Sequence, residues 1–457
     1  MDRRDHPRDD RSVDVEVEVG MEPDSLPPSG NVAYLGPELT ANAIASIEAS
    51  GWTFTPIDLL STEATLPANA TLLVLGIGME HPLKALVQAE AVKRSVAVRS
   101  DLAFFAHLSA AAPSSEHRHV VISGAAGKTT TAAILMSVLA QGGREATAAT
   151  AADGYLNALG QRSEVTILTA QTSALRDVTG LPASAGVILN MHSGEGQALG
   201  ARTKEAAAAL LLNASLGVLG ADDAGGQGLL MALKRRTGSG EANVIPISGG
   251  ATLSDGWFAI DRTIYAVRNG RTRRVGSYAG SVALIGDHLG QDAAAASAVA
   301  SHLGVSDDHI SAGLAAFRGV AGRFDCIGAE GRIVFVDDRY AASEASTTAA
   351  IAACPEVFWI GARQGRLSNK VRTSLRGSFF LTSPDLGGPP VDDVVTFADV
   401  TSATDAALRA ARDLVRRDPG ATPVLLFSPG ARGYGRQGEL FRLRALSFMT
   451  GRQAAHG

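Results

Sequence analysis

The segment His119-Val-Val-Ile-Ser-Gly-Ala-Ala-Gly-Lys-Thr-Thr-Thr131 joins a short β-branched run to a turn that contains two glycines. The next residues, Ala132 to Ala140, are rich in alanine and leucine, and they predict a helix that begins directly after the turn. A strand, a glycine turn and a helix in this order present backbone N–H groups and a helix N-terminus to an anion. The segment therefore predicts a phosphate site in a strand–helix unit.

The residue types in the turn indicate a nucleotide triphosphate. Gly124 and Gly127 allow the backbone to curl close to anionic oxygens, and Lys128 would reach the β- and γ-phosphates. The hydroxyl of Thr129 or Thr130 would hold Mg²⁺, with Thr129 as the expected metal ligand. A glycine turn in an ordinary strand–helix unit is the alternative, but Gly-Lys-Thr in this context is rarely accidental. We therefore expect ATP and Mg²⁺ as cofactors.

Composition limits the classes of protein to which the chain can belong. The chain has 457 residues, 46% of them hydrophobic, so it has enough core material for about three domains. A net charge of −5 and no basic stripe argue against a nucleic-acid partner. No apolar run is long enough to span a bilayer, and the charged first residues do not form a signal peptide. We expect a cytoplasmic protein with a disordered tail over residues 1–30.

Strand and helix patterns alternate along the rest of the chain, which predicts an α/β fold in three domains. Residues 31–113 are expected to form an N-terminal Rossmann-like domain. Residues 114–318 are expected to form a central P-loop ATPase-like domain with a mostly parallel sheet, and residues 319–457 a C-terminal Rossmann-like domain. Within the central domain, Thr252 to Leu284 is predicted to form a β-rich insertion ahead of a helix from Gly290 to Leu303.

Motifs in all three segments resemble those of the Mur ligase superfamily, and most of all its glutamate-adding branch. The resemblance covers the chain from about Asn31 to the C-terminal helix. Besides the phosphate loop, it rests on the following residues in family order: Leu35-Gly36, Asp58, Arg99 to Phe105, Arg323-Phe324, Asp337 to Ile351, and Ser428-Pro429 with Phe441, Arg444 and Phe448. The central segment Ala151 to Tyr155 resembles cyanophycin synthetase-type relatives.

The resemblance implies an ATP-dependent carboxylate–amine ligase that works through an acyl phosphate. It places Lys128 and Asp338 among the catalytic residues, and His288 and Arg323 beside the nucleotide. The N-terminal domain would bind the acyl donor, for which UDP-N-acetylmuramoyl-L-alanine is a candidate, and the C-terminal domain would bind an amino acid. A monomer is expected.

Several family positions differ in this chain. The family's metal-binding glutamate falls on Leu168 or Thr169, and the following His192 and Glu195 stand out of family register. His192 and Glu195 belong either to a rewired metal site or to a solvated loop. Leu59 and Leu60 replace a charged residue that contacts uracil. Two alternatives therefore stay open: a nucleotide-binding paralogue with a regulatory or partner-binding role, and a ligase on a non-UDP substrate.

Overall fold

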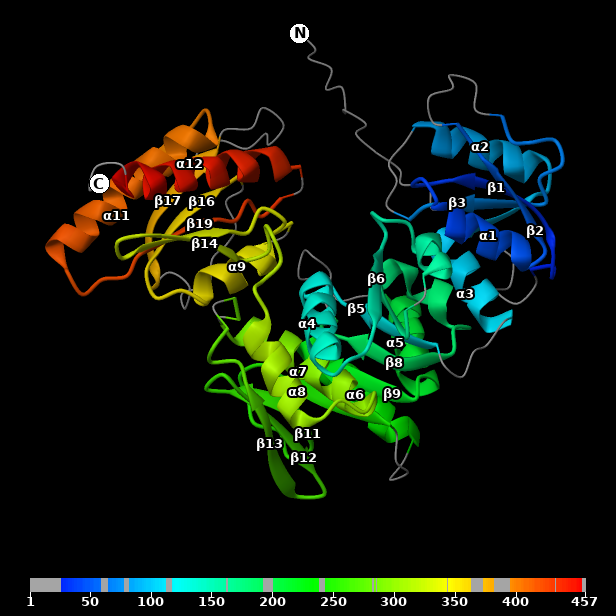
Figure 1. Cartoon of the computed structure of the whole chain (residues 1–457), viewed down its shortest axis with the longest axis horizontal. Helices are drawn as coiled ribbons and strands as arrows, with labels where there is room; N and C mark the ends of the chain where they lie inside the picture. The colour runs from blue at the N-terminus through cyan, green and yellow to red at the C-terminus, as the bar shows by residue number, and fades with distance from the viewer. Residues whose placement is uncertain are drawn as a thin grey trace, which may run out of the picture.

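The described part of the chain folds into three β-sheets, each with its own helices (Figure 1). The computed structural model describes residues 26–58, 65–77, 82–111, 117–161, 163–191, 200–237, 243–281, 283–284, 286–342, 344–362, 373–381, 395–431 and 433–453. Most of the predicted tail, Leu59, Leu60, His192 and Glu195 lie outside these residues. The expected α/β class with three domains is confirmed.

The N-terminal sheet is fully parallel, with strand order β2-β1-β3-β4. Its strands and helices follow one another along the chain as β1 (Gly30–Leu35), α1 (Ala41–Ala49), β2 (Trp52–Pro56), β3 (Leu72–Leu75), α2 (Pro82–Lys93), β4 (Ala97–Ser100) and α3 (Asp101–Ala111). Thr40 caps α1, because its hydroxyl accepts a hydrogen bond from Ala43 N. Strands alternating with helices give the Rossmann-like arrangement that the sequence predicts.

The central sheet contains the strand that leads into the phosphate loop. Its order is β13-β12-β11-β10-β9-β8-β5-β7-β6, and the ladder from β11 to β6 is parallel. Its elements are β5 (Arg118–Ser123), α4 (Lys128–Gln141), β6 (Ala146–Thr150), η1 (Tyr155–Gly160), β7 (Val165–Ala170), η2 (Thr172–Val178), β8 (Ala183–Ile188), α5 (Ala201–Asn213), β9 (Leu216–Gly220), α6 (Ala224–Thr237), β10 (Val244–Ser248), β11 (Gly256–Ile260), β12 (Thr263–Arg268), β13 (Arg271–Ser277), α7 (Asp287–His302) and α8 (Asp307–Ala316).

The segment expected as a β-rich insertion extends the central sheet. β11 pairs in parallel with β10, and β12 and β13 add antiparallel strands at the edge. Gly270 lies in the turn between β12 and β13, while Gly276 lies within β13. The following helix α7 begins at Asp287, three residues earlier than Gly290. This earlier start places His288 in the first helical turn.

The C-terminal sheet has the order β14-β15-β19-β16-β17-β18. Among these described strands, β14 pairs antiparallel with β15, and the other neighbours pair in parallel. The elements are β14 (Asp325–Glu330), β15 (Ile333–Asp337), α9 (Glu344–Ala352), β16 (Val357–Gly361), β17 (Leu375–Leu381), β18 (Val395–Phe397), α11 (Val400–Arg417), β19 (Val424–Phe427) and α12 (Gly435–Gln453). No helix in the described part of the chain is long and apolar enough to cross a membrane.

Two hydrophobic cores cross the boundaries between the sheets. One core contains Val120 and Leu135 of the central domain together with Trp359 and Leu426 of the C-terminal domain. Another combines the central sheet with N-terminal residues such as Trp52. Burial of apolar surface therefore holds both outer domains against the central one, on either side of it in Figure 1.

Asp101 joins the N-terminal domain to the central domain through backbone hydrogen bonds. It is fully buried at the start of α3, and its carboxylate accepts hydrogen bonds from Ile77 N at 3.0 Å and Tyr155 N at 3.2 Å. The Tyr155 hydroxyl in turn donates to Thr169 O at 2.6 Å. Burial raises the pKa of Asp101 to about 6, although the backbone N–H groups favour the ionised form.

The raised pKa of Asp101 predicts a pH-dependent loss of stability. The folded state holds the Asp101 proton more tightly than the unfolded state, so the contribution of this group falls as pH rises from about 4 through about 6. Thermal unfolding of wild type and Asp101→Asn between pH 4.5 and 7.5 measures this change. We expect the stability of wild type relative to the variant to fall with rising pH, by about 2 kcal/mol over this range.

Asp255→Asn, at an exposed loop position, serves as the matched control. The control gives the pH dependence expected from removing an ordinary exposed carboxylate. If the stability difference between wild type and Asp101→Asn depends on pH no more than the stability difference for Asp255→Asn does, the stated role of Asp101 is wrong.

Candidate active site

The phosphate loop connects β5 to α4 through two glycines with positive φ. Gly124 has φ +143° and Gly127 has φ +85°, values that side chains rarely permit. A Cβ atom at Gly124 would lie 3.1 Å from Asn190 Oδ1, and one at Gly127 would lie 2.4 Å from Asp292 Oδ1. Both glycines are therefore required by backbone conformation and by neighbouring side chains.

Lys128 is the first residue of α4, and its ammonium group folds back across the loop. Its Nζ donates a hydrogen bond to Gly124 O at 2.6 Å. Thr129 is half-buried and Thr130 is buried in the same helical turn. The helix N-terminus adds the positive end of its dipole. The geometry fits a polyphosphate, because loop amides, helix terminus and a cation converge at one point.

Asn190, which the sequence analysis did not single out, contacts the loop directly. It follows β8, and its Oδ1 accepts hydrogen bonds from Ala125 N at 2.5 Å and Ala126 N at 3.1 Å. Its Nδ2 donates to Ala126 O at 3.2 Å. The carboxamide thus uses two amide groups of the loop and one carbonyl group.

Helix α7 places the carboxyl group of Asp292 against Gly127 of the loop. Asp292 is buried, and its neighbours include Gly127, Lys128 and Thr131. Burial raises the pKa of Asp292 well above its usual range, against the opposing effects of Thr131 and Lys128. The next residue toward the N-terminus, Gln291, donates from Nε2 to Leu189 O at 2.6 Å. The first turns of α7 therefore hold both the loop and the segment after β8.

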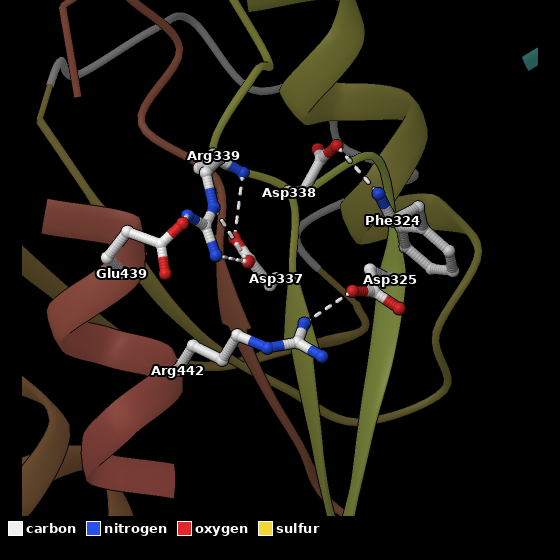
Figure 2. A network of polar contacts seen from close by, with 7 residues as sticks. All are labelled: Phe324, Asp325, Asp337, Asp338, Arg339, Glu439 and Arg442. Atoms are coloured by element: carbon white, nitrogen blue, oxygen red, sulfur yellow. Dashed lines mark hydrogen bonds and ion pairs between the residues drawn. The ribbon is translucent and has the colours of Figure 1, made fainter. Parts of the chain in front are cut away.

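His288, one turn before Asp292 on the same helix, contacts the junction with the C-terminal domain. Its ring meets the ring of Phe324 edge-on, with centroids 5.7 Å apart. Phe324 is buried and has φ +51°, a left-handed conformation that is unfavourable for a side chain of this size. Asp338 Oδ1 accepts a hydrogen bond from Phe324 N at 3.0 Å and so stabilises this conformation (Figure 2).

Asp338 is buried directly after β15. Its Oδ2 accepts a hydrogen bond from Ser428 Oγ at 2.9 Å, and its backbone N donates to Phe427 O at 2.8 Å. Burial raises the pKa of Asp338 to about 7, while Ser428, Phe324 and Arg323 favour the charged form. A carboxyl group in this state titrates near neutral pH.

Arg323 lies beside Asp338 at the same junction. Burial lowers the pKa of Arg323, and the charge of Asp338 opposes this shift. The guanidinium carbon lies 5.4 Å from the centroid of the Tyr340 ring, a cation–π contact. Tyr340 itself is 53% exposed, so this pair borders the solvent.

A second polar network fastens α12 to β14 and to the end of β15, directly before Asp338. Arg339 forms an ion pair with buried Asp337, with Nε 2.8 Å from Oδ2, and another with Glu439 of α12 (Figure 2). Arg442 Nη1 also donates to Asp325 Oδ2 at 2.6 Å. These contacts fix the orientation of the residues that flank Asp338.

The predicted site residues thus fall into two clusters along α7. One cluster forms the phosphate loop and the start of α4, and it contains Gly124, Gly127, Lys128, Thr129 and Thr130. Asp292 contacts this loop. Arg323 and Asp338 lie at the domain junction, which His288 reaches through Phe324. Because His288 and Asp292 are four residues apart, they lie on the same face of α7.

The described residues contain no group of three or more His, Cys, Asp and Glu side chains that could hold a metal ion. Leu168 and Thr169 are both buried in β7, at the position expected for a metal-binding carboxylate.

Asp222 accepts hydrogen bonds from Ser248 Oγ and Gly249 N, and Asp223 accepts from Met191 N and Gly226 N. These hydrogen bonds give the pair a structural role.

Sequence comparisons connect the chain to named enzymes. It is 29% identical over 304 residues to the UDP-N-acetylmuramoylalanine–D-glutamate ligase of Phenylobacterium zucineum, covering 64% of this chain and 63% of that protein. It is 28% identical over 327 residues to the ligase of the same name from Caulobacter vibrioides strain NA1000, covering 67% and 66%. The matches thus span less than two thirds of either relative. No family model matches the chain.

Two solved structures share its fold. The chain superposes on UDP-N-acetylmuramate–alanine ligase from Thermotoga maritima with a TM-score of 0.55 at 14% identity, covering 92% of this chain and 99% of that one. The MurF ligase from Thermotoga maritima in complex with ADP gives a TM-score of 0.52 at 17% identity, covering 85% and 96%. These similarities extend over all three sheets.

The positive φ of Gly127 and the close approach of Asp292 predict a large loss of stability when one methyl group is added at this position. Gly127→Ala must adopt an unfavourable φ and also displace Asp292, whereas Gly143→Ala, at φ +69° just beyond the same helix, meets no atom within 4 Å. We expect Gly143→Ala to lower the free energy of unfolding by about 1 kcal/mol and Gly127→Ala by about 1–3 kcal/mol more. Urea unfolding measures both; equal losses would contradict the close approach of Asp292.

Proposed function

We propose that this chain is a member of the Mur ligase superfamily and an ATP-dependent ligase that forms an amide bond between an amino acid and UDP-N-acetylmuramoyl-L-alanine. The observation that carries this proposal is the phosphate loop, in which Gly124, Gly127 and Lys128 have the geometry to hold a polyphosphate. Similarity to glutamate-adding ligases supports the choice of acyl donor and makes glutamate the first acceptor to test.

The proposed reaction has two steps. A carboxylate oxygen of the acyl donor attacks the γ-phosphorus of ATP, so the bond to the ADP oxygen breaks and an acyl phosphate forms. The amino group then attacks the carbonyl carbon, and phosphate leaves with the former carboxylate oxygen while the amine loses a proton. Mg²⁺ held at Thr129 would neutralise negative charge on the phosphates.

The chain's own residues provide binding and electrostatic stabilisation. The N-terminus of α4 and the loop amides hold the phosphates, and Lys128 stabilises the charge on the transferred phosphoryl group. Arg323 and His288 are proposed to contact the nucleotide from the domain junction. Asp338, whose pKa lies near 7, orients Phe324 and Ser428 there and is the proposed catalytic carboxylate.

Each domain has a proposed role in gathering the substrates. We assign residues 31–113 to the acyl donor, 114–318 to ATP and 319–457 to the amino acid. The continuous core between the central and C-terminal sheets would transmit changes at the loop to the junction. We further propose that the protein works in the cytoplasm as a monomer and without a nucleic-acid partner.

A second candidate is a nucleotide-binding paralogue that does not ligate. It is favoured by the buried Leu168 and Thr169, which offer no carboxylate to a metal at the end of β7. A third, a ligase with a non-UDP acyl donor, rests on Leu59 and Leu60 in the sequence. Substrate panels distinguish these candidates.

Phosphate release tests the proposed activity. Purified protein with ATP, Mg²⁺ and UDP-N-acetylmuramoyl-L-alanine should release phosphate only when a suitable amino acid is added. Lys128→Ala should lower this release by at least about a hundredfold, because it removes a cation from the phosphoryl-transfer site. The control is Lys84→Ala, which removes a lysine from α2 in the N-terminal domain.

Phosphate release that is independent of the amino acid would contradict ligation. Binding of ADP without any turnover would favour the paralogue. Turnover with an acyl donor that lacks UDP would favour the third candidate.

A further inference from the structure

The Asn190 carboxamide accepts hydrogen bonds from backbone amides that the proposed phosphate loop would offer to its ligand. Loops of this kind hold the β- and γ-phosphates through their backbone amides. Two of these amides, Ala125 N and Ala126 N, donate instead to Asn190 Oδ1. Because each N–H has one hydrogen to donate, a phosphate oxygen and the carboxamide oxygen would compete for these two groups.

The position of Asn190 is set by the backbone on both of its sides. Leu189 N donates to Ser123 O at 2.9 Å, and Leu189 O accepts from Gln291 Nε2 at 2.6 Å. Met191 N donates to Asp223 Oδ2 at 3.2 Å, and the Met191 side chain is buried. With the backbone held in this way, the carboxamide can leave the loop only by rotating about its side-chain bonds.

Three further features fit a contact built into the loop. Gly124 leaves room for Asn190, since a Cβ there would lie 3.1 Å from Oδ1. Asn190 Nδ2 donates to Ala126 O, so both the oxygen and the nitrogen of the carboxamide form hydrogen bonds with the loop. Lys128 Nζ bonds to Gly124 O on the same loop, so the ammonium group also has a protein acceptor that a phosphate would replace.

We propose that Asn190 competes with the terminal phosphates of the nucleotide for the loop amides and thereby sets the affinity of the site for polyphosphates. This inference rests on the proposed function, because it deepens the role of the same loop. Before phosphate binds, the neutral Asn190 oxygen satisfies two partly buried donors that would otherwise lack a protein partner. Binding exchanges this neutral acceptor for a charged one, which forms stronger hydrogen bonds.

Two substitutions at the same position separate competition from structural support. Asn190→Ala removes the competing acceptor, so we expect ADP and inorganic pyrophosphate to bind about tenfold more tightly. Asn190→Asp places a negative charge against the same amides, so we expect both ligands to bind at least about tenfold more weakly. Adenosine, which has no phosphate, should bind equally to wild type and both variants. Isothermal titration calorimetry measures these affinities.

Asn157→Ala is the matched control. Asn157 also makes side-chain hydrogen bonds to three backbone groups, Thr40 N, Glu38 O and Asp153 O, but at the junction with the N-terminal domain. This control should leave pyrophosphate affinity unchanged. Weaker pyrophosphate binding by Asn190→Ala would show that Asn190 supports the loop and would overturn the proposal, and so would unchanged binding.

Amide hydrogen exchange gives a second measurement without any ligand. Ala125 and Ala126 amides should exchange faster in Asn190→Ala than in wild type, and equal exchange would contradict the proposal. Tighter pyrophosphate binding by Asn190→Ala without amino-acid-dependent phosphate release would support this inference while the proposed ligase activity fails. Release in wild type with no gain in affinity in the variant would reject the inference alone.

Discussion

The close packing of backbone around the phosphate loop is the constraint on which the rest of the site depends. Five residues from Ser123 to Gly127 must turn from a strand into a helix while Asn190 approaches at Gly124 and Asp292 approaches at Gly127. Only glycine fits at the two points where these side chains approach. The same loop brings the N-terminus of α4 and the Lys128 ammonium group together, an arrangement that favours an anion.

Helix α7 connects this loop to the rest of the proposed site. Asp292 lies under the loop, Gln291 holds the segment after β8, and His288 reaches Phe324 at the junction. Phe324 keeps a left-handed backbone because Asp338 accepts its N–H and the ring is buried. A change at the loop therefore has a short path of direct contacts to the C-terminal domain, along one helix and one buried carboxyl group.

The sequence predicted the elements whose signals are local. The β5–α4 unit was recognisable because its glycines, lysine and helix pattern are adjacent in the chain, and the parallel sheets follow from alternating strands and helices. Asn190 was missed as a loop neighbour because it contacts the loop across about 65 residues, where spacing carries no information. β12 and β13 looked like an insertion, since edge pairing with β11 is settled only by the folded sheet.

The central claim is that the chain activates a carboxylate as an acyl phosphate. UDP-N-acetylmuramoyl-L-alanine labelled with ¹⁸O in its carboxyl group tests this claim directly, with mass spectrometry of the released phosphate. The account predicts one ¹⁸O atom in each phosphate, formed together with an amide product. Unlabelled phosphate released during turnover would show that water, not the carboxylate, attacks ATP, and it would contradict the account.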